Sequence, residues 1–147
     1  MSKQLTSSIV LDASPGAVWE VLSDFDSYPE WNPFIVSAEG DPREGSRLTL
    51  RMQPAVGRAV TIKPTVIEAE PRHRVRWRGR IGKRHLFGAE HVFTLVDAPE
   101  GGTRLSQTER FTGVLVPLMS RSLDRGTLPA FHLMNEALKR RVERPRG

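Results

Sequence analysis

Three segments between residues 74 and 111 alternate between apolar and polar side chains, and this pattern limits the fold more than any other feature of the chain. Residues 74–81 alternate arginines with apolar residues or glycine, and residues 87–95 and 105–111 each place mostly apolar side chains at every second position. A segment with proline and two glycines at 97–102 separates the last two, as in a hairpin loop. Successive side chains of a strand point to opposite faces, so the pattern predicts an antiparallel sheet with one apolar and one charged face.

Further strand patterns cover residues 3–11, 47–52 and 60–69. Between the first two, Ser14 followed by Pro15 predicts a helix start, because the hydroxyl can cap the helix and proline lacks an N–H that would be unpaired there. Apolar residues then recur at helical spacing, and Asp24 can cap a second short helical turn. Each proline pushes its predecessor out of the helical region, so the prolines of residues 28–34 end this segment.

The last third of the chain, about residues 115–143, predicts a long helix. Its apolar stripe follows a spacing of three and four residues from Leu128 to Val142. Gly126 and Pro129 interrupt the pattern, and a proline within a helix removes a hydrogen bond, so a kink or break is expected between residues 124 and 129. This helix is the only predicted element long enough to cover the apolar face of the sheet. A curved sheet around a helix can leave a hollow between the two, which would hold a ligand.

Composition narrows the functional classes. The 147 residues predict a single domain, and the absence of cysteine excludes disulfides, thiolate nucleophiles and cysteine zinc sites. No segment resembles a signal peptide or a membrane span, so a cytoplasmic protein without membrane insertion is expected. The net charge of +5 raises the question of an anionic partner. The sequence has no phosphate-binding glycine loop, no nucleophile elbow around a serine and no histidine pair with metal-ligand spacing, so no metal or cofactor is predicted.

Two parts of the chain resemble a known superfamily. Residues 13–22 read ASPGAVWEVL and residues 24–34 read DFDSYPEWNPF, while residues 90–95 and 102–113 read EHVFTL and GTRLSQTERFTG. These motifs resemble the START-like (SRPBCC) superfamily, whose helix-grip fold is shared with the major pollen allergens. The resemblance implies an α+β domain over residues 1–147, with two short helices after the first strand. It also implies a curved antiparallel sheet of about seven strands wrapped around a long C-terminal helix.

The same resemblance bears on function. Members similar to this chain are often described as polyketide cyclases or dehydrases, and others carry lipids, sterols, quinones or hormones. The superfamily has no shared catalytic motif, so no catalytic residue is transferred from it.

His91 and Glu109 are the predicted catalytic pair. Both share a face with the apolar residues of the last hairpin, and a turn centred near Glu100 places them directly opposite each other. Opposed Cβ atoms lie about 5 Å apart, close enough for an imidazole–carboxylate hydrogen bond that could move a proton. The same pair can instead simply satisfy its own hydrogen bonds within a core, which is the commoner reason for such pairing.

The remaining candidates would line the hollow or flank its entrance. The predicted ligand-binding residues are Trp31, Phe34, Met52, Trp77, Phe87, Phe93, Gln107, Phe111, Met119, Phe131, Met134 and Asn135. Trp31 and Phe34 suit an entrance, although anchoring their loop is the simpler role. Asn135 interrupts the apolar stripe of the last helix, and its amide could point at a ligand or bond a backbone carbonyl freed by the kink. His132 lies one residue off the stripe and is expected to be partly exposed.

Arginines at 72, 74, 76, 78 and 80 form a predicted outward stripe, with Arg47 and Arg51 near it. The stripe could bind phosphate backbone or acidic lipid headgroups. A solvated charged face is the favoured interpretation, because aromatic residues for base stacking are not interleaved with the arginines, so no nucleic acid is expected.

Two functions compete for the interior of the fold, and a third hypothesis, binding of an anionic partner by the arginine stripe, stays open. The leading hypothesis is binding of a small hydrophobic or amphipathic ligand, such as a lipid, polyketide or isoprenoid, between the sheet and the last helix. The alternative is a polyketide cyclase- or dehydratase-like enzyme with His91 as acid or base, Glu109 orienting it, and Asn135 or a bound water polarising a carbonyl. Whether any reaction is catalysed, which ligand binds, and whether the chain forms a homodimer stay open at this stage.

Overall fold

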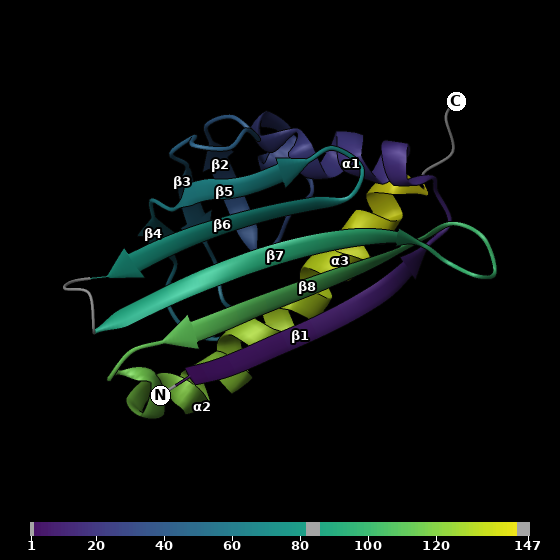
Figure 1. The fold of residues 1–147 in the computed structure, drawn as a ribbon. Helices are drawn as coiled ribbons and strands as arrows, with labels where there is room; N and C mark the ends of the chain where they lie inside the picture. The colour runs from purple at the N-terminus through teal and green to yellow at the C-terminus, as the bar shows by residue number, and fades with distance from the viewer. Residues whose placement is uncertain (1, 82–85, 144–147) are drawn as a thin grey trace.

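The computed structural model describes residues 2–81 and 86–143, and for Ile81 it describes the backbone only. Residues 1, 82–85 and 144–147 lie outside the described residues, and they include His85, one of the four histidines, and the end of a basic C-terminal segment, residues 139–146. The chain runs β1(Ser2–Leu11), α1(Pro15–Ser23), η1(Phe25–Glu30), β2(Ile35–Glu39), β3(Thr49–Met52), β4(Val60–Ile62), β5(Thr65–Glu70), β6(Arg74–Ile81), β7(Phe87–Asp97), β8(Thr103–Thr112), α2(Val116–Ser122), η2(Leu123–Thr127) and α3(Leu128–Val142) (Figure 1). This order confirms the predicted α+β fold, with a long C-terminal helical segment on a curved antiparallel sheet.

The strands form two antiparallel sheets. The larger has the order β1-β8-β7-β6-β5 and the smaller has the order β2-β3-β4. The predicted single strand over 60–69 is wrong, because Pro64 lies between β4 and β5 and has no N–H to donate to a ladder. The Pro64 carbonyl instead accepts a hydrogen bond of 2.8 Å from the Leu48 amide, and a bridge pairs Arg47 with Thr65. The two sheets are therefore joined at this seam.

The first helix begins as predicted. The Ser14 hydroxyl accepts a hydrogen bond of 3.2 Å from the Ala17 amide, and Pro15 occupies the first turn. Val18 and Leu22 are buried, so α1 turns its apolar side towards the core. The helical spacing of the apolar residues thus decides which side of α1 faces the core, while the cap fixes where the helix starts.

The predicted break in the last helix is confirmed, and it takes the form of a π-helical turn, η2, between α2 and α3. Gly126 lies at the point where this turn touches the loop after β3. The Ala55 amide donates a 2.9 Å hydrogen bond to the Gly126 carbonyl, and a Cβ on Gly126 would lie 2.8 Å from the Val56 carbonyl oxygen. Beyond the break, α3 lies across the inner face of the large sheet (Figure 1). Close approach of two backbones explains the glycine here.

The outer face of the large sheet carries the arginines of β6, paired with acidic residues of the neighbouring strands. Glu68 of β5 lies 3.5 Å from Arg74 and 3.4 Å from Arg76. Glu90 of β7 lies 3.1 Å from both Arg76 and Arg78. These cross-strand pairs alternate in charge across three strands, as expected of a solvated sheet face.

Arg72 was predicted to belong to this stripe, and that assignment is wrong. It lies in the turn between β5 and β6 with a positive φ of 69°. Its Cδ is 3.7 Å from the position that a Cβ would take on Gly16, so it lies beside the first helix instead. Arg51 is on β3 and belongs to the smaller sheet.

Among the helices of the described residues, none combines the length and the apolar character that crossing a bilayer requires.

Candidate functional site

His91 and Glu109 face each other on the inner side of the large sheet. They are paired residues of β7 and β8, as the hairpin register predicts. His91 Nδ1 lies 3.5 Å from Glu109 Oε1, and the two residues are 0% and 6% exposed. Nδ1 makes no hydrogen bond within the part of the chain that the structure describes, so the contact is close but not well aligned. The structure thus brings His91 and Glu109 together in the buried core.

The other ring nitrogen begins a buried row of polar side chains, here termed the polar row: His91, Gln107, Asn135 and Ser7. His91 Nε2 lies 3.0 Å from Gln107 Oε1, Gln107 Nε2 donates to Asn135 Oδ1 at 2.7 Å, and Asn135 Nδ2 donates to Ser7 Oγ at 3.0 Å. The row crosses from β7 through β8 and α3 to β1. It ties the helix to the sheet by side-chain hydrogen bonds.

The polar row determines which imidazole nitrogen carries a proton. Gln107 uses its amide N–H groups on Asn135 and on the Phe131 carbonyl (3.4 Å), so its Oε1 must accept from His91 Nε2–H. In a neutral ring, Nδ1 then presents its lone pair to Glu109. Nδ1 therefore carries the lone pair that a proton donor entering this part of the core would meet.

Four aromatic rings enclose the imidazole. Ring centroids of Phe93, Phe131, Trp77 and Phe34 lie 4.5, 5.2, 5.5 and 6.4 Å from that of His91. All four were predicted ligand-binding residues, and all are buried. They come from β7, α3, β6 and the loop before β2, so the fold gathers them from across the sequence.

The other predicted lining residues are spread over the same core. Phe87 and Phe111 stack on each other with centroids 5.7 Å apart, four residues along β7 from His91 and so away from it. Met52 and Met134 are buried in the core, and Met119 on α2 is partly buried. The predicted set is thus one continuous core, of which only part surrounds the histidine.

Of the two predicted roles of Asn135, the bond to a backbone carbonyl is not formed, and the ligand contact stays a prediction. Its side-chain amide is used within the polar row, and it is Gln107 that reaches a helix carbonyl, at Phe131. Sequence reasoning missed Ser7, the last member of the row. The sequence pattern did indicate an inward position for Ser7, because it lies an even number of residues from Leu5 and Leu11 on β1 and so faces the same side of the sheet.

Two more buried polar residues lie near the predicted entrance. Asn32 Oδ1 accepts hydrogen bonds from the Phe34 and Ile35 amides at 2.9 and 2.8 Å, which fixes the loop before β2. Trp31 packs on Tyr28 at 5.3 Å. The Tyr28 hydroxyl donates to the Leu22 carbonyl, and burial, with the nearby charge of Asp24, raises the pKa of this phenol far above its ordinary value. These contacts favour the anchoring role for Trp31 and Phe34.

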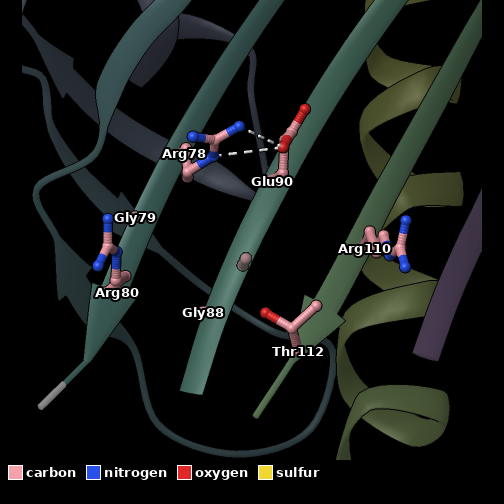
Figure 2. Close-up of a pocket in the computed structure, with 8 residues that line it drawn as sticks. Arg78, Gly79, Arg80, Gly88, Glu90, Arg110 and Thr112 are labelled. Carbon is pink, nitrogen blue, oxygen red and sulfur yellow. Dashed lines mark hydrogen bonds and ion pairs between the residues drawn. The ribbon is translucent and has the colours of Figure 1, made fainter. Parts of the chain in front are cut away.

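The predicted hollow between the sheet and α3 is occupied near His91 by the enclosing rings. A pocket lies on the opposite, outer face of the sheet, around Arg78, Arg80 and Thr112 (Figure 2). Within residues 2–81 and 86–143, no three histidine or acidic side chains lie close enough to share a metal ion.

Comparisons with known proteins place the chain in a family. Residues 2–143 match the family model described as "Polyketide cyclase / dehydrase and lipid transport". The chain belongs to this family. The match confirms the superfamily resemblance read from residues 13–34 and 90–113. No curated protein gives a significant match.

Solved structures of similar fold support the same placement. A START superfamily protein from Mycobacterium smegmatis is 23% identical, with a TM-score of 0.74 over 95% of this chain and 97% of that one. The di-domain ARO/CYC protein BexL from the BE-7585A biosynthetic pathway is 14% identical, with a TM-score of 0.78 over 99% of this chain and 51% of that one. Protein MLL2253 from Mesorhizobium loti is 17% identical, with a TM-score of 0.76 over 99% of this chain and 100% of that one. At these identities the likeness concerns the fold.

Proposed function

We propose that the protein binds a small hydrophobic or amphipathic molecule between the large sheet and α3. The polar end of the ligand would meet His91 and its apolar body would lie among the surrounding rings. The observation that carries the proposal is His91 Nδ1, which is fully buried and, although Glu109 Oε1 lies 3.5 Å away, makes no hydrogen bond within the described residues. Buried polar atoms nearly always have a partner, and a ligand hydroxyl or carboxylic acid could donate to this nitrogen. The family description, which includes lipid transport, supports the same class of ligand.

Such a ligand needs space that side chains now fill. Met52 and Met134 lie in the same core, and their unbranched thioether chains can change conformation at low cost. Phe34, in the loop before β2 and held by the Asn32 turn, lies beside the histidine ring. Binding would therefore displace methionine and loop side chains and leave the strand framework in place.

The experiment is a fluorescence titration with a dansyl-labelled fatty acid. His91→Phe keeps an aromatic ring of similar size and removes the nitrogen, so it should weaken binding by about tenfold, the loss of one good hydrogen bond. Leu133→Ala is the matched control, because Leu133 lies on the same helix and is 51% exposed. Absence of saturable binding, or equal affinity in the His91→Phe variant, would contradict the proposal.

A second candidate, acid–base catalysis like that of a cyclase or dehydratase, is favoured by the contact between His91 and Glu109. Nδ1 is the ring nitrogen that Gln107 does not hold, so it can take a proton from a carbon next to a carbonyl. Gln107 would keep the ring oriented through Nε2, and the nearby Glu109 carboxylate would stabilise the imidazolium that forms. Because the Asn135 amide is used by the polar row, polarising a carbonyl would require it to release Ser7.

This candidate can be tested by proton exchange. Wild-type protein should speed deuterium exchange at the carbons next to the carbonyl of 2-decanone, measured by NMR in heavy water. His91→Phe should abolish the effect and Glu109→Gln should reduce it. If the His91→Phe variant exchanges as fast as the wild type, the pair has no catalytic role.

A further inference from the structure

The outer face of the large sheet carries a pocket of about 360 Å³ that neither proposed function uses. It lies over β6, β7 and β8, on the side of the sheet away from α3 (Figure 2). We term it the outer pocket and define it by the residues Arg78, Arg80, Gly88, Glu90, Arg110 and Thr112.

A glycine makes this hollow. Gly88 is paired with Arg80 on β6 and with Thr112 on β8, so it is the centre of a row across three strands. A Cβ on Gly88 would lie 3.3 Å from Thr112 Oγ1 and 3.7 Å from Arg80 Cγ. Most outward positions of a sheet carry a side chain that fills this space. Here the missing side chain leaves a floor on which a small group can rest.

The charges around the outer pocket are unbalanced. Three arginines and one glutamate line it, which leaves two more positive than negative charges. Glu90 holds Arg78 through bonds of 3.1 and 3.3 Å, so that guanidinium is fixed. Among the described residues, neither Arg80 nor Arg110 has an acidic partner within ion-pair distance, and both are exposed. Two guanidinium groups with unused donors therefore flank the floor.

We propose that the outer pocket binds a phosphate group. Planar guanidinium donors match phosphate oxygens, and the Thr112 hydroxyl, which lies beside the glycine, can donate a further hydrogen bond. The Arg110 guanidinium points away from Gly88 in Figure 2, and its exposed side chain can turn towards a bound anion. The volume exceeds that of one phosphate, so the remainder of a phosphate monoester or a lipid headgroup would also fit.

The first experiment is NMR of labelled protein titrated with inorganic phosphate. The amide signals of Gly88 and Thr112 should shift in a saturable manner, and Arg80→Gln should weaken the binding by about tenfold. Gly88→Val should abolish it by filling the floor. This residue is in an extended strand on a solvent-facing surface, so the fold should be retained.

Arg104→Gln is the matched control. Arg104 is an exposed arginine on the same strand and the same face as Arg110, six residues or about 20 Å away. Arg104→Gln and Arg80→Gln each remove one positive charge, so the general attraction of the protein for anions falls equally in the two variants. Equal weakening by Arg80→Gln and Arg104→Gln, or no saturable shift at Gly88, would overturn the proposal.

A second arm separates the two sources of phosphate. The amount of protein that sediments is measured with vesicles of phosphatidylcholine alone and with vesicles that also contain one quarter phosphatidic acid. Sedimentation that needs the acidic lipid and is lost in Arg80→Gln assigns the pocket to a lipid headgroup. Binding of inorganic phosphate without sedimentation assigns it to a soluble phosphate compound. Failure of both arms refutes the site and leaves the interior ligand proposal untouched, because the outer pocket lies on the face of the sheet away from α3.

Discussion

Replacing Gln107 by leucine tests whether the polar row holds α3 to the sheet. Gln107 is 0% exposed and makes three hydrogen bonds, to His91, Asn135 and the Phe131 carbonyl. Leucine has a similar volume, so packing is largely kept. His91 Nε2 and Asn135 Oδ1 would each lose a bond, at roughly 1–3 kcal/mol apiece, and the buried leucine regains about 1 kcal/mol. We expect the free energy of unfolding to fall by about 1–5 kcal/mol.

The assay is equilibrium unfolding in urea, and a melting curve should show a fall of roughly 2–4 °C per kcal/mol. Thr108→Ala is the control, because Thr108 is the next residue on β8 and faces outwards with only a 3.4 Å contact to Thr6. The double variant Gln107→Leu/Asn135→Leu should lose less than the sum of the single variants, since both partners of one bond are then removed together. A loss below about 0.5 kcal/mol in Gln107→Leu, or strict additivity in the double variant, would refute the role of the polar row.

Three further predictions follow from single contacts. Gly126→Ala should destabilise the protein by about 1–3 kcal/mol in urea unfolding, because its Cβ would lie 2.8 Å from the Val56 carbonyl oxygen; an unchanged midpoint would contradict the close approach. Tyr28, the single tyrosine, should form no tyrosinate at its ordinary pKa of 10.0 while the protein stays folded, because burial raises the pKa; absorbance at 295 nm checks this. Glu143 accepts a hydrogen bond from the Asp12 amide, which lowers its pKa, so Glu143→Gln should reduce stability by about 0.5 kcal/mol at pH 7. That difference should vanish as the pH falls through the lowered pKa, and a difference that persists at pH 2 would contradict it.

Much of the fold could be predicted from local patterns. The alternation over residues 74–111 identified three strands and their inward faces, and the hairpin loop at 97–102 set the register that opposes His91 and Glu109. Register follows from loop length and parity, which are properties of sequence alone. The break before Pro129 was equally predictable, because proline disrupts a helix in any surroundings.

The candidate site was only partly predictable. The sequence indicated Asn135 and Gln107 as polar residues at inward positions, but it could not show that they bond to each other. That contact depends on how far α3 is rotated and shifted over β8, which packing of the whole core decides. The parity of β1 indicated that Ser7 points inwards, but the sequence could not show its bond to Asn135, which is 128 residues away in the chain.

The sequence by itself determined which elements form, where most of them begin and end, and which side chains face inwards, because these depend on steric preferences within a few residues. Only the tertiary structure decided that aromatic rings from four segments close around His91 and that a pocket lies on the outer face of the sheet. Filling a space depends on the rotamers and volumes of residues distant in sequence. The inner face is filled because large rings meet there, and the outer face is hollow because Gly88 has no side chain between Arg80 and Thr112.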